Sequence, residues 1–266
     1  MRTPITYYGG KQQLAPLILG LIPQHEVYNE PFFGGGAIFF AKRPSKREFI
    51  NDISAAMVNF YKVLQSDFEA LKELIDDTLH SESTFKEAKE LYLNGCEDSV
   101  RWAWAVFVCS HQSMYSILDG SWRVSTVTNS AKEWQTCKRW FSDVYAKRLE
   151  ATSIFCRDAV SQIKAVDDGV AFHYCDPPYF NSDCGCYEGY TEEDFRRLLS
   201  TLEGIKGRFL LSSYPSDVLT EFVERNGWRS MSVVMSKSAG SKTGSQKVEM
   251  LTYNYDAERD RQRCLF

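Results

Sequence analysis

The segment with the clearest chemical character is Asp176-Pro177-Pro178-Tyr179, which directly follows an apolar stretch at residues 170–175. Its two prolines fix the backbone and lack N–H donors, so the segment presents acceptors, the Asp176 carboxylate and the Pro177 carbonyl. Two acceptors suit an aromatic amine, because hydrogen bonds to both of its N–H groups favour pyramidalisation and stabilise the positive charge that develops when the nitrogen attacks. Tyr179 adds an aromatic face on which a base, flipped out of a duplex, can stack. The segment predicts a site for the exocyclic amine of a base; a Pro-Pro turn with an N-capping aspartate is the structural alternative.

A second group of residues suggests a nucleotide ligand. Gly34-Gly35-Gly36 lies between a predicted strand at residues 26–30 and a predicted helix at residues 37–41, where backbone approaches a cofactor in doubly wound sheets. Asp52 ends the next strand, about 20 residues further on, where a carboxylate can bind a pair of ribose hydroxyls. A purely steric need for the glycines, and a capping or turn role for Asp52, are the alternatives.

Strand and helix patterns alternate at both ends of the chain and stop between them. Beyond the strands already named, strands are expected at residues 48–53, 152–156, 170–175 and 209–213, with a terminal antiparallel pair at 228–235 and 247–255. Helices are expected at residues 11–21, 54–65, 158–165, 191–202 and 217–226, and the stretches 67–93, 99–115 and 131–149 read as helical only. We predict an α/β fold, a doubly wound, mostly parallel Rossmann-like sheet at residues 1–56 and 151–266, interrupted by a helical insertion at residues 57–150.

Composition narrows the class of protein. The chain of 266 residues carries a net charge of −4, and its eight cysteines show no paired spacing. This predicts reduced thiols, and the four scattered histidines give no reason to expect a metal. No apolar run approaches the roughly 20 residues that cross a bilayer, and residues 1–5 lack the long apolar stretch of a signal peptide. We therefore expect a cytoplasmic protein with no membrane partner.

The predicted insertion is distinctive in its side chains. Residues 101–148 hold seven basic residues against three acidic ones, and five of the six tryptophans lie in the insertion. Trp122 and Arg123 follow a turn and suit contact with a displaced base, a guanine edge or a phosphate. Lys237 and Lys242 lie in a second segment without acidic residues, so we predict that these four residues bind DNA. Solvated helix faces are the ordinary alternative.

Four motifs in fixed order resemble those of a known family, the amino-methylating DNA methyltransferases and specifically their Dam-like adenine-N6 group. The motifs are Tyr7-Tyr8-Gly9-Gly10-Lys11, Glu30-Pro31-Phe32-Phe33-Gly34-Gly35-Gly36, Asn51-Asp52 and Asp176-Pro177-Pro178-Tyr179. They span nearly the whole chain. The resemblance implies an adenine-N6 DNA methyltransferase that uses S-adenosylmethionine and acts on a flipped adenine in double-stranded DNA. Whether a cognate restriction endonuclease is its partner is left open.

The resemblance also implies roles for single residues. S-adenosylmethionine contacts are implied for Tyr7, Lys11, Phe32, Phe33, Gly34, Asp52, Asp158 and Asp176. Asp52 would take the ribose hydroxyls, Asp158 would lie by the adenine of the cofactor, and residues 176–179 would bind the target base. The helical insertion would read the DNA sequence, although residues 110–115 and the stretch after them do not resemble the base-reading hairpin of GATC-methylating enzymes.

Several rival functions remain open from the sequence. Cytosine-N4 methylation is the nearest in chemistry, but that class usually carries serine where Asp176 stands. Methylation of RNA or of a protein glutamine amide, a nicotinamide oxidoreductase, and a catalytically inactive DNA-binding regulator are the others. An oxidoreductase could use the glycine turn and Asp52 but would have no use for residues 176–179 or for a basic, tryptophan-rich insertion.

Overall fold

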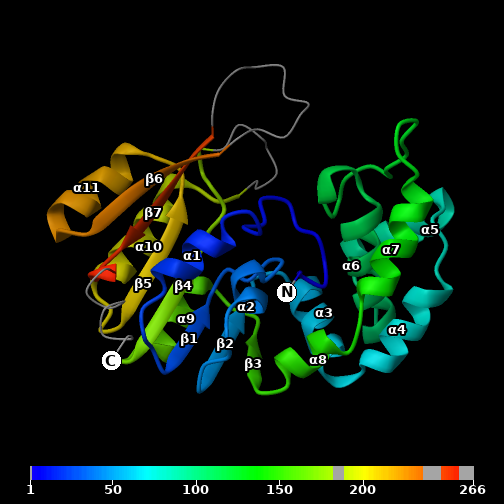
Figure 1. Ribbon diagram of the computed structural model, residues 1–266, viewed down its shortest axis with the longest axis horizontal. Coiled ribbons are helices and arrows are strands. Elements are labelled where there is room, and N and C mark those ends of the chain that lie inside the picture. Colours follow the sequence, from blue (N-terminus) through cyan, green and yellow to red (C-terminus); the bar gives the residue numbers. More distant parts are fainter. Residues whose placement is uncertain (1, 182–188, 236–246, 258–266) are drawn as a thin grey trace. The chain divides into compact units, whose positions relative to one another are not determined.

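A computed structural model describes residues 2–181, 189–235 and 247–257, and a seven-stranded sheet carries its fold (Figure 1). The strands are β1 (Val27–Glu30), β2 (Arg47–Asn51), β3 (Thr152–Phe155), β4 (Ala171–Cys175), β5 (Arg208–Ser213), β6 (Arg229–Met235) and β7 (Lys247–Tyr253). Their order in the sheet is β3-β2-β1-β4-β5-β7-β6. Neighbours from β2 to β5 run parallel, whereas β7 is antiparallel to both β5 and β6. The predicted doubly wound, mostly parallel sheet and its terminal antiparallel pair are confirmed.

Helices fill most of the remaining described chain. They are α1 (Ala15–Leu21), α2 (Ala37–Ala41), α3 (Ala55–Ser66), α4 (Phe68–Asp77), α5 (Glu82–Asn94), α6 (Ser99–Gln112), α7 (Ser130–Trp140), α8 (Val144–Leu149), α9 (Ala159–Val166), α10 (Glu192–Glu203) and α11 (Asp217–Asn226), with a 3₁₀ turn, η1, at Met114–Ser116. None of the helices in the described chain is both long and apolar enough to cross a bilayer.

Three helical predictions need correction. The stretch 67–93, predicted as one helix, is divided into α4 and α5, with Thr78 and Ser81 extended between them. The predicted helix at residues 11–21 begins only at Ala15, because the chain before it forms turns. The stretch 131–149, predicted as one helix, is divided into α7 and α8. Phe141 caps α7 in an extended conformation and is 2% exposed, so burial of its ring in the core competes with continuation of the helix.

The chain forms two compact units. The first comprises residues 1–19, 33–44 and 51–156, and the second comprises residues 20–32, 45–50 and 157–266. The first unit thus joins the helical stretch to the N-terminal segment and to the turns that follow β1 and β2. Reading residues 57–150 as a separate target-recognition domain stays a prediction.

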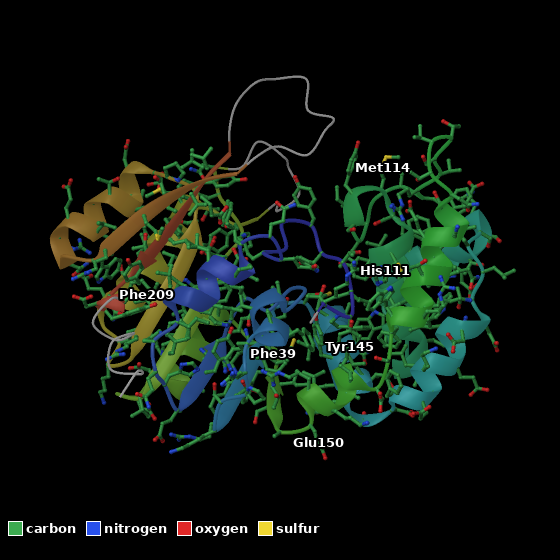
Figure 2. The ribbon with its side chains drawn as sticks, in the orientation of Figure 1. Phe39, His111, Met114, Tyr145, Glu150 and Phe209 are labelled. Atoms are coloured by element: carbon green, nitrogen blue, oxygen red, sulfur yellow. The ribbon has the colours of Figure 1, made fainter. Side chains whose placement is uncertain are left out.

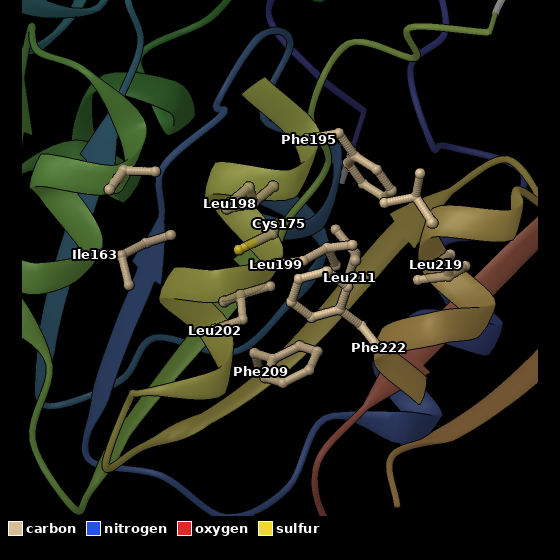
Figure 3. Close-up of a cluster of buried hydrophobic side chains, with 12 residues drawn as sticks. Ile163, Cys175, Phe195, Leu198, Leu199, Leu202, Phe209, Leu211, Leu219 and Phe222 are labelled. Carbon is tan, nitrogen blue, oxygen red and sulfur yellow. The ribbon is translucent and has the colours of Figure 1, made fainter. Parts of the chain in front are cut away.

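In the second unit, three helices cover one face of the sheet. Side chains of α9, α10 and α11 pack on Cys175, Phe209 and Leu211 of β4 and β5, and Figure 3 shows this cluster. Burial of each large apolar side chain contributes about 1.5–3 kcal/mol. The cluster therefore fixes the position of β4 and, with it, the start of the segment at residue 176.

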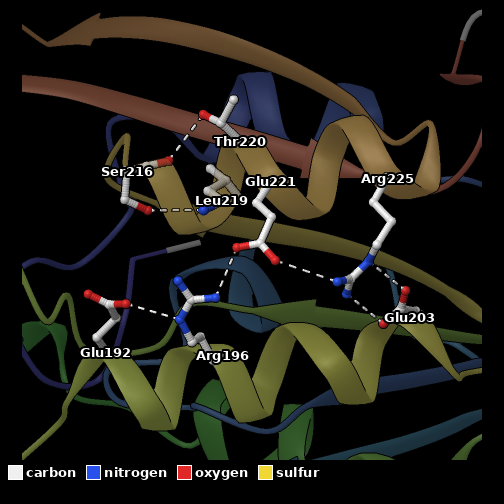
Figure 4. Close-up of polar contacts among 8 residues, drawn as sticks. All are labelled: Glu192, Arg196, Glu203, Ser216, Leu219, Thr220, Glu221 and Arg225. Carbon is white, nitrogen blue, oxygen red and sulfur yellow. Dashed lines mark hydrogen bonds and ion pairs between the residues drawn. The ribbon is translucent and has the colours of Figure 1, made fainter.

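Ion pairs link α10 to α11 on the outer surface of that unit (Figure 4). Arg196 lies 3.0 Å from Glu221, and Arg225 lies 2.9 Å from Glu203. These side chains are about 35–49% exposed, and exposed pairs contribute only about 0–1 kcal/mol. The apolar cluster beneath the two helices supplies most of their attachment.

In the first unit, α6 is the central helix. Nine of its residues are buried, among them Phe107, whose ring lies 4.8 Å from that of Phe141. A further aromatic cluster extends from α2 to α8, where the rings of Phe40 and Tyr145 are 5.7 Å apart; Figure 2 labels Tyr145 and the neighbouring Phe39. These contacts join the helical stretch to the helix that follows the glycine turn.

Candidate active site

The order of the strands marks one edge of the sheet as the place for a ligand. The chain runs from β1 through β2 to β3 in one direction, and β4 and β5 lie on the other side of β1. In open α/β sheets ligands bind outside the carboxyl ends of the strands, where the strand order reverses. Here that point lies between β1 and β4.

The strand register brings the predicted motifs to this edge. Asn29 of β1 pairs with His173 of β4, so the chains leave both strands at the same level. Glu30 pairs with Ile50 of β2, two residues before Asp52. Cys175 pairs with Leu211, so Asp176 leaves β4 beside the end of β5. The three predicted motifs all follow strands whose carboxyl ends share this edge.

Within the first unit, the glycine turn is held through Gly34. Its N–H donates to Asp52 Oδ2 at 2.9 Å, and its carbonyl accepts from the Tyr61 hydroxyl at 2.7 Å. Asp52 Oδ1 accepts from Ser54 N–H at 2.9 Å, and Ser54 caps α3 as predicted. Burial raises the pKa of the Asp52 carboxyl, and the Ser54 and Gly34 N–H groups oppose that shift. Asp52 thus orders the turn after β1 while it remains half-buried.

The glycines are also required by Tyr7. A Cβ added to Gly35 would lie 3.0 Å from the Tyr7 Cβ, and one added to Gly34 would lie 3.2 Å from the Tyr7 ring. Gly34 also has a φ of 45°, in the region that favours glycine. The steric explanation for these glycines is therefore at least partly correct. Lys11, 8% exposed, donates from Nζ to the Gly9 carbonyl at 3.2 Å.

The two phenylalanines of the turn differ in environment. Phe33 is 3% exposed, and its ring lies 4.7 Å from that of Tyr61 and 5.4 Å from that of Phe39. A cofactor contact by Phe33 would therefore come from its backbone. Phe32 is partly exposed, lies against the apolar cluster of the second unit, and meets the Tyr190 ring edge-on at 6.5 Å. Its side chain remains a candidate for ligand contact.

In the second unit, Tyr179 links two carboxylates. Its hydroxyl lies 3.1 Å from Asp176 Oδ1 and closer still to Glu249 Oε1 of β7. The same Glu249 oxygen accepts from Ser212 Oγ at the end of β5. Burial raises the pKa of Tyr179 well above its usual value, and the charges of Asp176 and Glu249 add to the effect. The phenol is therefore protonated at neutral pH.

A second aromatic ring packs on Tyr179. The Tyr179 and Tyr214 rings are 4.3 Å apart and inclined at 54°, so they pack on each other. The side chain of Tyr179 is thus fixed at its hydroxyl and supported on one side of its ring.

Asp158 has a structural role. It caps α9 by accepting from Ser161 N–H at 2.9 Å, and its other oxygen pairs with Arg197 Nη2 at 2.6 Å. Burial opposes these hydrogen bonds, but the net effect lowers the pKa of Asp158. Its predicted place beside the cofactor adenine has no support in these contacts and stays a prediction.

The predicted DNA-binding residues fall into two groups. The Trp122 ring lies 5.1 Å from the His80 ring, and Arg123 pairs with Glu133 at 2.9 Å and donates to the His111 carbonyl at 3.4 Å. Contact with DNA would therefore have to compete with these intramolecular contacts of Trp122 and Arg123. Lys237 and Lys242 lie outside the described residues.

Sequence reasoning missed Glu249. It is 6% exposed in β7, and its carboxylate reaches Tyr179 because β7 pairs with β5. The pattern around it, Val248-Glu249-Met250-Leu251, places a charge within an apolar strand, which was the one available clue.

Comparisons with known proteins agree with the motifs. The sequence model of the D12 class N6 adenine-specific DNA methyltransferases matches residues 7–226. The chain is 28% identical to Type II methyltransferase M1.LlaDCHI of Lactococcus lactis subsp. cremoris, with 93% of each chain covered. It is 26% identical to Type II methyltransferase M.MjaIII of Methanocaldococcus jannaschii, over 94% of this chain and 98% of that one. It is 24% identical to the DNA N-6-adenine-methyltransferase of Escherichia phage P1, over 93% of this chain but 34% of that longer protein.

Proposed function

The chain belongs to the D12 class N6 adenine-specific DNA methyltransferase family, and from that premise we propose how its residues divide the reaction. Residues of the turns after β1 and β2 bind S-adenosylmethionine, and the segment after β4 binds and polarises the target adenine. The observation that supports this division is the strand register, in which β1, β2 and β4, the strands that precede the three segments, end at the edge where strand order reverses.

The residues after β1 and β2 fit the methyl donor. The Asp52 carboxylate accepts from the N–H groups of Gly34, Ser54 and Ile53, and with about four acceptor sites it can also accept from a ribose hydroxyl. Gly34 has no side chain to keep a ligand from its backbone. Tyr7 and Lys11 complete the set that we assign to the donor. When bound, S-adenosylmethionine supplies an electrophilic methyl group on a sulfonium.

Asp176 and the Pro177 carbonyl act on the acceptor. They accept hydrogen bonds from the two N–H groups of the adenine amine and so stabilise the positive charge that develops on the nitrogen. Attack on the methyl group gives a positively charged methylated ammonium, which is strongly acidic and loses its proton to Asp176 or to water, so no base with a raised pKa is needed. Tyr179 provides the face on which the flipped base stacks, a contact worth about 1–3 kcal/mol.

We assign recognition of double-stranded DNA to the helical stretch at residues 57–150, with Arg123 as its first candidate contact. Two relatives named as type II methyltransferases support action beside a restriction endonuclease. That role would place the enzyme in the cytoplasm of a bacterial or phage-infected cell. Protection of DNA in cells against endonucleases of known site tests the pairing.

The test of the proposed function begins in a host free of DNA methylation. Expression of the protein, genome-wide mapping of modified bases and nucleoside analysis should give N6-methyladenine at one short sequence. Asp176→Ala should then lower methyl transfer on a duplex carrying that sequence by at least about a thousandfold, with duplex binding retained. Turnover by Asp176→Ala at the wild-type rate would remove Asp176 from the mechanism, and N4-methylcytosine would redirect the assignment of the base.

A further inference from the structure

The carbonyl groups that end α6 are bound by two different segments of the first unit. The last four carbonyl groups of an α-helix have no partner within the helix itself. In α6 the first of the four accepts from the cap residue. The carbonyl of Ser110 accepts from the Thr6 hydroxyl at 2.6 Å. The carbonyls of His111 and Gln112 accept from the guanidinium and the backbone N–H of Arg123, at 3.4 and 2.8 Å.

One of these segments leads directly into the residues that we assign to the methyl donor. Thr6 precedes Tyr7, the first of them in the sequence. Close to Thr6, the Pro4 carbonyl accepts from Nε2 of His111 at 3.2 Å. The last turn of α6 is therefore held to residues 4–6 by two hydrogen bonds, one from each side.

The other segment is the exposed one between α6 and α7, which contains Arg123, the first candidate for a DNA contact. Besides its two bonds to α6, Arg123 pairs with Glu133 of α7 at 2.9 Å. A β-bridge between Ser113 and Trp122 closes the segment directly after α6. The position of Arg123 therefore follows from that of the last turn of α6.

Resting on the donor and DNA roles proposed above, we propose that Thr6 is a positioning residue that couples donor binding to DNA binding. S-adenosylmethionine bound by Tyr7 and Lys11 restricts the motion of Thr6, and the bond from Thr6 to the Ser110 carbonyl then restricts the last turn of α6. Less conformational entropy is left to lose when the exposed segment at residues 113–129 orders on a duplex, so the donor strengthens DNA binding. By linkage, the duplex strengthens donor binding by the same factor.

The ratio of two dissociation constants measures this coupling. Both are for a fluorescent duplex with the mapped sequence, one without cofactor and one with saturating S-adenosylhomocysteine, which has no methyl group to transfer. We expect a ratio of about ten for the wild type and of about two for Thr6→Val, since one neutral hydrogen bond corresponds to a factor of about two to ten. The affinities for S-adenosylhomocysteine alone and for the duplex alone should change less than about twofold. Thr6→Ser keeps the hydroxyl and should keep the wild-type ratio.

Hydrogen exchange gives a second readout, which needs no DNA. Saturating S-adenosylhomocysteine should slow amide exchange at residues 113–129 about threefold in the wild type, because the last turn of α6 is then restricted. In Thr6→Val the same addition should leave exchange in this segment unchanged. Exchange that slows equally in both proteins would contradict a link through Thr6.

The matched control is Thr220→Val, which removes another exposed threonine hydroxyl, one that donates to the Ser216 carbonyl at 3.1 Å at the start of α11 (Figure 4). Its ratio should equal that of the wild type. A ratio near one for the wild type, or the wild-type ratio for Thr6→Val, would overturn the role of Thr6. Loss of affinity for S-adenosylhomocysteine alone in Thr6→Val would overturn it as well, by making Thr6 a donor contact. Failure of the proposed function would show separately, as absence of N6-methyladenine or as turnover by Asp176→Ala.

Discussion

The turn after β1 and the segment between α6 and α7 are built in opposite ways. In the turn, both backbone groups of Gly34 are held by side chains, and Phe33 is buried. The segment at residues 113–129 is largely exposed: Tyr115 is 76% exposed at a φ of 59°, and Val127 is 92% exposed. Figure 2 labels Met114 at the start of this segment.

The difference matches the role that we propose for each region. A site for a fixed cofactor and a fixed reaction gains from being ordered before the ligand arrives, because less conformational entropy is lost on binding. A surface that reads DNA meets its partner by exposed side chains that exchange intramolecular contacts for intermolecular ones. Three substitutions test whether the turn is rigid and the segment adaptable, as this comparison requires.

The largest effect is expected for Gly36→Ala in the turn. Gly36 has a φ of 67°, and an added Cβ would lie 2.6 Å from the Phe33 ring. We expect the free energy of unfolding to fall by about 3 kcal/mol, from backbone strain of about 1–2 kcal/mol and overpacking of similar size. Gly227→Ala is the control, because Gly227 has a φ of 62° but no described atom within 4 Å of the added Cβ. Equal losses in urea denaturation for both variants would show that the Phe33 contact yields easily.

A smaller, pH-dependent effect is expected at His111, in the last turn of α6 before the exposed segment. Burial lowers the pKa of His111 to about 4, against the hydrogen bond that Nε2 makes with the Pro4 carbonyl. The unfolded chain takes up this proton near pH 6.5 and the folded chain does not, so stability falls as pH drops from about 6.5 to about 4.

The partial exposure of His111 reduces the expected loss to about 2 kcal/mol. The measurement is the difference in unfolding free energy between wild type and His111→Gln across this pH range, which removes the contributions of the other histidines. If this difference in unfolding free energy did not change with pH, His111 would have the same pKa in the folded and unfolded chains.

The smallest effect is expected for Arg123→Ala in the exposed segment. We expect about tenfold weaker duplex binding and relaxed preference at one base pair, because a bidentate base contact is worth about 1–3 kcal/mol. The single-turnover rate at saturating DNA should change less than about threefold. Lys132→Ala removes an exposed basic side chain of α7. If Lys132 contacts phosphate, this substitution should weaken binding by a similar factor for all DNA sequences. Unchanged affinity and preference for Arg123→Ala would show that Arg123 serves only its intramolecular contacts with Glu133 and the His111 carbonyl.

Local sequence predicted most of the fold. The strands that precede Asp52 and Asp176 were placed within two residues, because apolar runs ended by turn residues mark buried strands. The sequence did not predict the division of α7 from α8, because the burial of Phe141 depends on packing against residues that are distant in the sequence. Asp143 is the N-cap residue of α8, but its side chain makes no capping hydrogen bond, so the sequence signal for the start of this helix was weak.

The candidate site was predictable where it is continuous in sequence. Asp176 and Tyr179 lie within one motif, and Asp52 could be placed because it ends a strand. Glu249 could not be placed, because its meeting with Tyr179 depends on the register between β5 and β7. The ion pair that occupies Asp158 likewise depends on how α10 packs beside α9.

The sheet order has a consequence for how the enzyme matures. The ribosome makes β6 before β7, yet β7 lies between β5 and β6. Because β6 hydrogen-bonds to β7 in this order, it can join the sheet only together with that later strand. The contact between Glu249 and Tyr179 therefore waits until β7, the last of the described strands, has been made.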